Sequence, residues 1–153
     1  MSAWKPGRGL LGPLKPLIGA WISHPDAQVS PTPILCTRAF RAFGKGWLEL
    51  DARWEMGERG TYREIALFGA TADGGLGFYS FTNDGKRSEG MFADGSDIHE
   101  SAIAFEAQMP AGRARMLYWP TEDGVGFNFA VESKTQKGWN RFLCQTYRPA
   151  EPE

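Results

Sequence analysis

The chain has 153 residues, the length of one domain with a sizeable core; 42% of its residues are hydrophobic and 23% are charged. A net charge of −1 offers no basic excess for binding phosphates, which excludes a nucleic acid as the main partner. No stretch reaches the roughly 18 apolar residues of a membrane-spanning helix. We therefore expect no membrane association and a cytoplasmic location.

The N-terminal residues 1–16 contain several prolines and glycines and predict an irregular lead-in. Leu10, Leu11, Leu14 and Leu17 could form a short helical cap that closes one end of a barrel. Residues 23–33 include Pro25, Pro31 and Pro33 and predict the longest loop of the chain.

Ten short, apolar and aromatic-rich segments are separated by turn signals, and we expect each to form a strand. Asp73-Gly74-Gly75 and Asn83-Asp84-Gly85 favour the positive φ that tight hairpins require. The predicted strands span residues 18–23, 34–43, 47–56, 61–71, 76–82, 88–93, 98–109, 113–119, 125–133 and 139–148.

Short turns make consecutive strands antiparallel neighbours, and a meander of this many strands closes most easily as an up-and-down barrel. The prediction is an all-β fold with one antiparallel barrel of about 8–10 strands. We expect a cap at residues 1–16, the barrel domain at 17–149 and a tail at 150–153.

Alternation along the strands suggests which side chains line the barrel. Leu48, Leu50 and Ala52 share one face of their strand, while Glu49 and Asp51 share the other. The predicted ligand-binding residues are aromatic side chains, with one arginine as a possible polar anchor: Tyr79, Phe81, Phe105, Trp119, Phe127, Phe129, Tyr147 and Arg141.

The segment Leu17-Ile18-Gly19-Ala20-Trp21 resembles the start of the first strand in the calycin superfamily, which includes lipocalins and fatty-acid-binding proteins. The resemblance implies a calycin-like barrel in which Gly19 and Trp21 have structural roles. It also implies a basic residue of the last strand packed over Trp21; Arg148 matches that position and Arg141 is the alternative. A cation–π contact of this kind contributes about 0.5–2 kcal/mol.

Over residues 14–148 the plan is similar to a bacterial family of uncharacterised calycin-like proteins known as DUF1579. The shared features are the Gly-x-Trp start, a loop rich in proline and serine, evenly spaced hairpins and a final strand with Trp and Tyr. This family has no established general activity, so the resemblance implies a fold and a pocket.

Two related groups imply specific ligands. Fatty-acid-binding proteins hold a carboxylate with Arg-x-Tyr on the last strand, where this chain has Gln145-Thr146-Tyr147; Arg141 has the same parity and could supply the charge. Nitrobindin-like barrels bind haem through a histidine near the end of the chain. This sequence has only His24 and His99, so haem ligation would require an inward His99.

No catalytic or metal-binding motif is present, and we expect no metal and no cofactor. Cys36 and Cys144 are far apart in sequence and are expected to be free, buried thiols, with a disulfide as the alternative. If the face carrying Glu64 is internal, desolvation would raise its pKa and suit it to acid–base chemistry. Pairing with an arginine such as Arg38, or exposure to solvent, are the alternatives.

Three hypotheses follow. The first is binding of a small, largely apolar ligand inside the barrel, without catalysis. The second is a small calycin-like enzyme that uses an inward Glu64, His99 or tyrosine. The third is a filled barrel that acts as an interaction module, in which residues 125–129 could form the interface of a homodimer.

Overall fold

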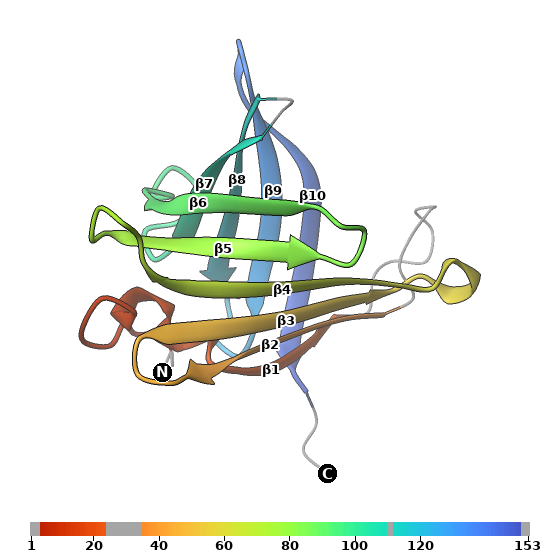
Figure 1. Cartoon of the computed structure of the whole chain (residues 1–153), viewed down its shortest axis with the longest axis horizontal. Coiled ribbons are helices and arrows are strands. Elements are labelled where there is room, and N and C mark those ends of the chain that lie inside the picture. The colour runs from red at the N-terminus through yellow and green to blue at the C-terminus, as the bar shows by residue number, and fades with distance from the viewer. Residues whose placement is uncertain (1–3, 24–34, 110–111, 151–153) are drawn as a thin grey trace.

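In the computed structural model, described for residues 4–23, 35–109 and 112–150, ten antiparallel strands form one closed barrel (Figure 1). The described residues contain two helical elements, the short 3₁₀ turns η1 (Gly12–Leu17) and η2 (Gly57–Arg59). The strands are β1 (Gly19–Ser23), β2 (Leu35–Phe43), β3 (Trp47–Glu55), β4 (Thr61–Ala70), β5 (Leu76–Thr82), β6 (Arg87–Ala93), β7 (Ile103–Met109), β8 (Gly112–Pro120), β9 (Phe127–Thr135) and β10 (Gly138–Pro149).

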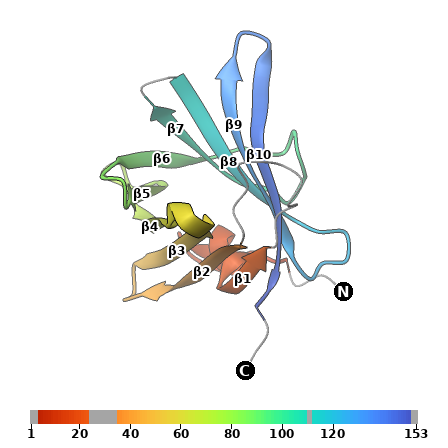
Figure 2. The ribbon, with the colours of Figure 1, turned by 90° about the vertical axis from the view of Figure 1, so that its right-hand side faces the viewer.

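Each strand pairs with the next strand in the chain, and β1 pairs with β10 to close the ring. Trp21 lies opposite Pro149, and Ile22 lies opposite Arg148. This arrangement confirms the prediction of an all-β, up-and-down antiparallel barrel. The strands β1–β5 run across the direction of β7–β10, so two curved walls enclose the interior (Figures 1 and 2).

The turn chemistry agrees with the sequence. Gly74 and Gly85 have φ angles of +87° and +88°, a region that side chains other than glycine disfavour. The loop predicted at 23–33 lies outside the described residues except for Ser23, which ends β1.

Two predicted strand starts are wrong. β7 begins at Ile103 rather than at residue 98, because residues 94–102 form a loop in which His99 Nδ1 accepts a hydrogen bond from the Ser101 amide at 2.9 Å. β9 begins at Phe127 rather than at residue 125, because Thr121 Oγ1 accepts a hydrogen bond from the Gly126 amide in the preceding turn.

The main hydrophobic core fills the end of the barrel next to η1. Leu14 and Leu17 of η1 are almost fully buried and pack with the inward aromatic side chains. Phe127 stacks on Tyr147, with ring centroids 5.1 Å apart. Among the described residues no helix is long and apolar enough to cross a membrane.

Truncation of Leu17 tests the role of η1 as a plug. The change Leu17→Ala should lower the free energy of unfolding by about 2–5 kcal/mol, because it leaves a cavity among close-packed rings. Leu10, which is 43% exposed, is the matched control, and Leu10→Ala should change stability by no more than about 0.5 kcal/mol. Urea denaturation measures both values; equal losses would contradict the plug.

Candidate functional site

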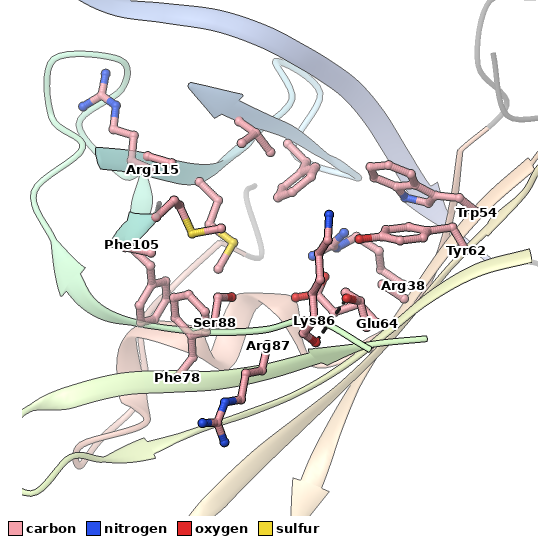
Figure 3. A pocket seen from close by; sticks show the side chains of 18 residues that line it. Arg38, Trp54, Tyr62, Glu64, Phe78, Lys86, Arg87, Ser88, Phe105 and Arg115 are labelled. Carbon is pink, nitrogen blue, oxygen red and sulfur yellow. Dashed lines mark hydrogen bonds between the residues drawn. The ribbon is translucent and has the colours of Figure 1, made fainter. Parts of the chain in front are cut away.

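A cavity of about 280 Å³ lies inside the barrel, at the end opposite η1 (Figure 3). Inward side chains from both walls line it, and most of them are apolar or aromatic. Phe78 and Phe105 lie on one side, and Trp54, Tyr62 and Arg38 come from the other. The cavity exists at this end because several of its wall positions are small residues: Ala52, Ala107 and Ala114.

The strand register explains how a cation and an anion reach the same cavity. Arg38 of β2 lies opposite Ala52 of β3, and Ala52 lies opposite Glu64 of β4. The three residues therefore form one row across the inner wall, with the smallest side chain in the middle. Arg38 and Glu64 are two strand spacings apart, about 10 Å at the backbone. No ion pair between them is found in the described part of the chain.

Arg38 is only 2% exposed, and aromatic groups surround it. Its Nη2 donates a hydrogen bond to the Tyr118 hydroxyl at 2.6 Å, and its guanidinium carbon lies 4.1 Å from the centre of the Phe129 ring. Burial disfavours the charge, but the nearby oxygens of Tyr118, Tyr147 and Glu64 outweigh this effect and raise the pKa of Arg38. Arg38 thus carries a positive charge inside an apolar cavity.

The hydrogen bonding of this wall is incomplete. Arg38 Nε and Trp54 Nε1 are both buried, and neither has a hydrogen-bond partner among the residues that the structure describes. Both residues line the cavity. Buried donors without acceptors are unusual in folded proteins, because each one forfeits its bonds to water.

Glu64 is half-buried in the cavity wall and accepts a hydrogen bond from the Ser80 hydroxyl. The face that carries it is therefore internal, as one branch of the sequence analysis supposed. Neither alternative, pairing with Arg38 or full exposure, is observed.

At the position that corresponds to the carboxylate anchor of fatty-acid-binding proteins, three polar side chains are linked by hydrogen bonds. The Tyr147 hydroxyl donates to Gln145 Oε1 at 2.9 Å, and Gln145 Nε2 donates to Cys36 Sγ at 3.2 Å. Burial raises the pKa of the Cys36 thiol. The interior cation near these residues is Arg38 of β2, a position that the sequence analysis did not assign to ligand binding.

The structure divides the predicted pocket residues into two groups. Phe105, Phe127, Phe129 and Tyr147 are buried inside the barrel, and Phe105 and Phe129 line the cavity. The other four point outward: Tyr79, Phe81, Trp119 and Arg141.

The inward orientation predicted for Tyr79 and Phe81 is wrong. On β5 the inward residues are Phe78 and Ser80, both buried, whereas Phe81 is 50% exposed. Tyr79 packs against the outer side chain of Trp47, with ring centroids 6.3 Å apart. Apolar side chains occupy both faces of β5, so alternation alone could not select the inner face.

Trp119 and Arg141 lie on the outer wall, and the prediction of Arg141 as an interior anchor is wrong. Arg141 Nε donates to Glu132 at 2.9 Å, and its guanidinium lies 5.2 Å from the Trp119 ring. A register shift between Arg141 and Leu143 interrupts the alternation on β10, so parity with Gln145 and Tyr147 does not extend to Arg141.

Trp21 has a different partner from the one that the calycin resemblance implied. Its Nε1 donates to the Leu17 carbonyl at 2.7 Å, and its ring meets Phe127 edge to face at 4.9 Å. Arg148 instead pairs with Asp123 at 2.7 Å and is exposed. Gly19 has a φ of +139°, which requires glycine at the start of β1.

The histidines and cysteines add no site. His99 lies in the loop before β7 and does not line the cavity, and His24 lies outside the described residues. Cys36 is a buried free thiol as expected, whereas Cys144 is free but exposed, which corrects the prediction that both are buried. Within residues 4–23, 35–109 and 112–150, no group of three metal-ligating side chains is found.

Comparison with known proteins supports the fold. No protein-family model and no curated protein matches the chain. Among solved structures, the chain is similar to the crystal structure of Rv2717c from M. tuberculosis, with a TM-score of 0.58 and 14% identity, over 94% of this chain and 99% of that one. The fold is a closed antiparallel barrel, which is consistent with the calycin-like fold predicted from the sequence. At this identity the similarity extends to the fold alone.

The buried phenol that supports Arg38 should give a pH-dependent stability. Burial raises the pKa of Tyr118 from 10.0 to about 12. The unfolded chain therefore releases this proton first, and the contribution of Tyr118 to stability is complete below pH 10 and is lost as the pH rises towards 12. The stability advantage of the wild type over Tyr118→Phe should shrink across this interval. Urea denaturation at a series of pH values measures it; parallel curves would contradict the assignment.

Proposed function

We propose that this protein binds a small, largely apolar ligand inside the barrel. The observation that carries the proposal is the cavity of about 280 Å³, lined mainly by apolar side chains with a few polar groups. Ligand sites in proteins typically have this character, since apolar walls supply affinity and a few polar groups fix the orientation.

The size of the cavity limits the ligand. An engineered cavity of about 150 Å³ holds one benzene molecule, so the present volume suits a ligand with one or two rings or a short acyl chain. A macrocycle as large as haem would require the walls to move apart, and no histidine of the described residues lines the cavity. The proposal therefore favours a compact ligand over haem.

The two competing hypotheses receive less support. An enzyme would use Glu64, which lines the cavity together with Tyr62 and Lys86, but among the residues that the structure describes no histidine or cysteine lines it. An interaction module would have a filled interior, whereas this barrel has a cavity. The predicted homodimer strand, β9, is paired with β8 and β10 on its two edges and offers no free edge for a second copy.

We also propose that the protein belongs with the DUF1579-like calycins and that it acts in the cytoplasm. A homodimer formed through another surface remains part of this proposal. Native mass spectrometry of the freshly purified protein would report both a bound ligand and the oligomeric state.

Filling the cavity tests the proposed function. Ala114 of β8 is paired with Ala107 of β7, and both residues line the cavity. The change Ala114→Phe should therefore occupy the space that the ligand needs. The affinity for naphthalene, measured by the quenching of tryptophan fluorescence, should fall by about tenfold or more, because the introduced ring would occupy the place of the probe in the cavity.

Phe81→Ala is the matched control, because it changes aromatic volume on the outer wall and should leave the affinity unchanged. Circular dichroism checks that both variants fold. If naphthalene binds Ala114→Phe as tightly as the wild type, the ligand does not occupy this cavity. If naphthalene and its derivatives fail to bind the wild type at all, the proposed function is wrong.

A further inference from the structure

We propose that the ligand carries a carbonyl-type oxygen acceptor, as in a carboxylate, ketone or amide, and that Arg38 and Trp54 hold this oxygen. This inference rests on the proposed function and specifies the chemistry of the ligand.

The cavity wall that contains Arg38 and Trp54 lacks hydrogen-bond acceptors for two buried donors. Arg38 Nε and Trp54 Nε1 are hydrogen-bond donors, and both are buried without partners among the described residues. Guanidinium and indole groups contain no acceptor, so these two side chains cannot satisfy each other. The missing partner is an acceptor that binds from the cavity.

The second step is position. Arg38 lies opposite Ala52, and Trp54 lies opposite Cys36, on the paired strands β2 and β3. Arg38 and Trp54 are therefore diagonal neighbours on one face, with backbones about 7–8 Å apart. Ala52 lies beside both of them and leaves room above its methyl group. One oxygen atom, or the two oxygens of a carboxylate, can accept from both donors there.

The third step is the orientation of the guanidinium. Phe129 covers one face of the Arg38 group, and Tyr118 accepts from Nη2. Arg38 Nε is a buried nitrogen without a hydrogen-bond partner in the region of the chain that the structure describes. A planar carbonyl or carboxylate group is the partner that the Nε edge of a guanidinium group binds best. Figure 3 shows Arg38 reaching towards the middle of the pocket, below Trp54 and Tyr62.

The fourth step concerns the other charged residues that line the cavity, which are Glu64, Lys86, Arg87 and Arg115. The Arg87 and Arg115 guanidinium groups point away from the cavity (Figure 3). Glu64 accepts a hydrogen bond from Ser80 and lies across Ala52 from Arg38, so its charge attracts that of the arginine without occupying Nε. A neutral carbonyl and a carboxylate both satisfy the donors. They differ in whether they add a second negative charge near Glu64, and the experiment below separates them.

The test compares three probes of equal ring size: naphthalene, naphthyl methyl ketone and naphthoate. Calorimetry on the wild-type protein should show that the better of the two oxygen-bearing probes binds about tenfold or more tightly than naphthalene, the usual value of a buried hydrogen bond to a charged group. A preference for naphthoate identifies an anionic ligand, and a preference for the ketone identifies a neutral one.

Arg38→Met should abolish this preference while naphthalene binds within about twofold of its wild-type affinity, because the apolar walls remain. Trp54→Phe removes one N–H group and keeps the aromatic ring, and it should reduce the preference by about threefold to tenfold. Should Arg38→Met fail to fold, judged by circular dichroism, Trp54→Phe carries the test.

Arg87→Met is the matched control for charge. Arg87 borders the cavity, but its guanidinium points away from it (Figure 3). This change should leave the preference intact; an equal loss in Arg87→Met and Arg38→Met would show general electrostatic attraction and overturn the inference. Naphthalene binding as tightly as both oxygen-bearing probes would overturn it as well, while leaving the proposed function standing.

Discussion

The pairing of β1 with β10 closes the barrel, and closure gives all inward side chains one shared interior. Alternation along each strand then decides which side chains compete for that space. Large rings and the leucines of η1 fill the end next to η1, whereas alanines on β3, β7 and β8 leave the other end open. The cavity is thus a consequence of side-chain size within a fixed backbone ring.

A buried arginine is costly unless its charge and all its donors are compensated. Tyr118 and Phe129 compensate Arg38 in part, through one short hydrogen bond and one ring face. A buried arginine with an unpaired donor is stable only if the rest of the fold tolerates the missing hydrogen bond or if a ligand supplies it. The unpaired Arg38 and Trp54 nitrogens lie in residues that line the interior cavity, and this position favours the second explanation.

Sequence reasoning recovered the architecture because turn signals and strand lengths are local features. It was also correct for strands with one polar face, such as β3, where Leu50 and Ala52 are buried and Glu49 and Asp51 are not. It was wrong for β5, where apolar residues occupy both faces and the pairing with β4 and β6 selects the inner one. It was wrong for Arg141, because a register shift on β10 cannot be read from residue types.

The two most buried arginines show why environment, rather than residue type, separates structure from function. Arg115 lies under the loop before β7 and is bonded to Asp97 at 2.8 Å and to Glu132 at 2.7 Å. Burial disfavours its charge, but the two carboxylates raise its pKa and occupy its donors. Arg115 therefore holds the loop before β7 against the outer face of the barrel through these two ion pairs. Arg38 is equally buried but has no carboxylate partner in the described structure, and it faces a cavity. The same side chain stabilises a loop in one place and, in the function that we propose, binds the ligand in the other.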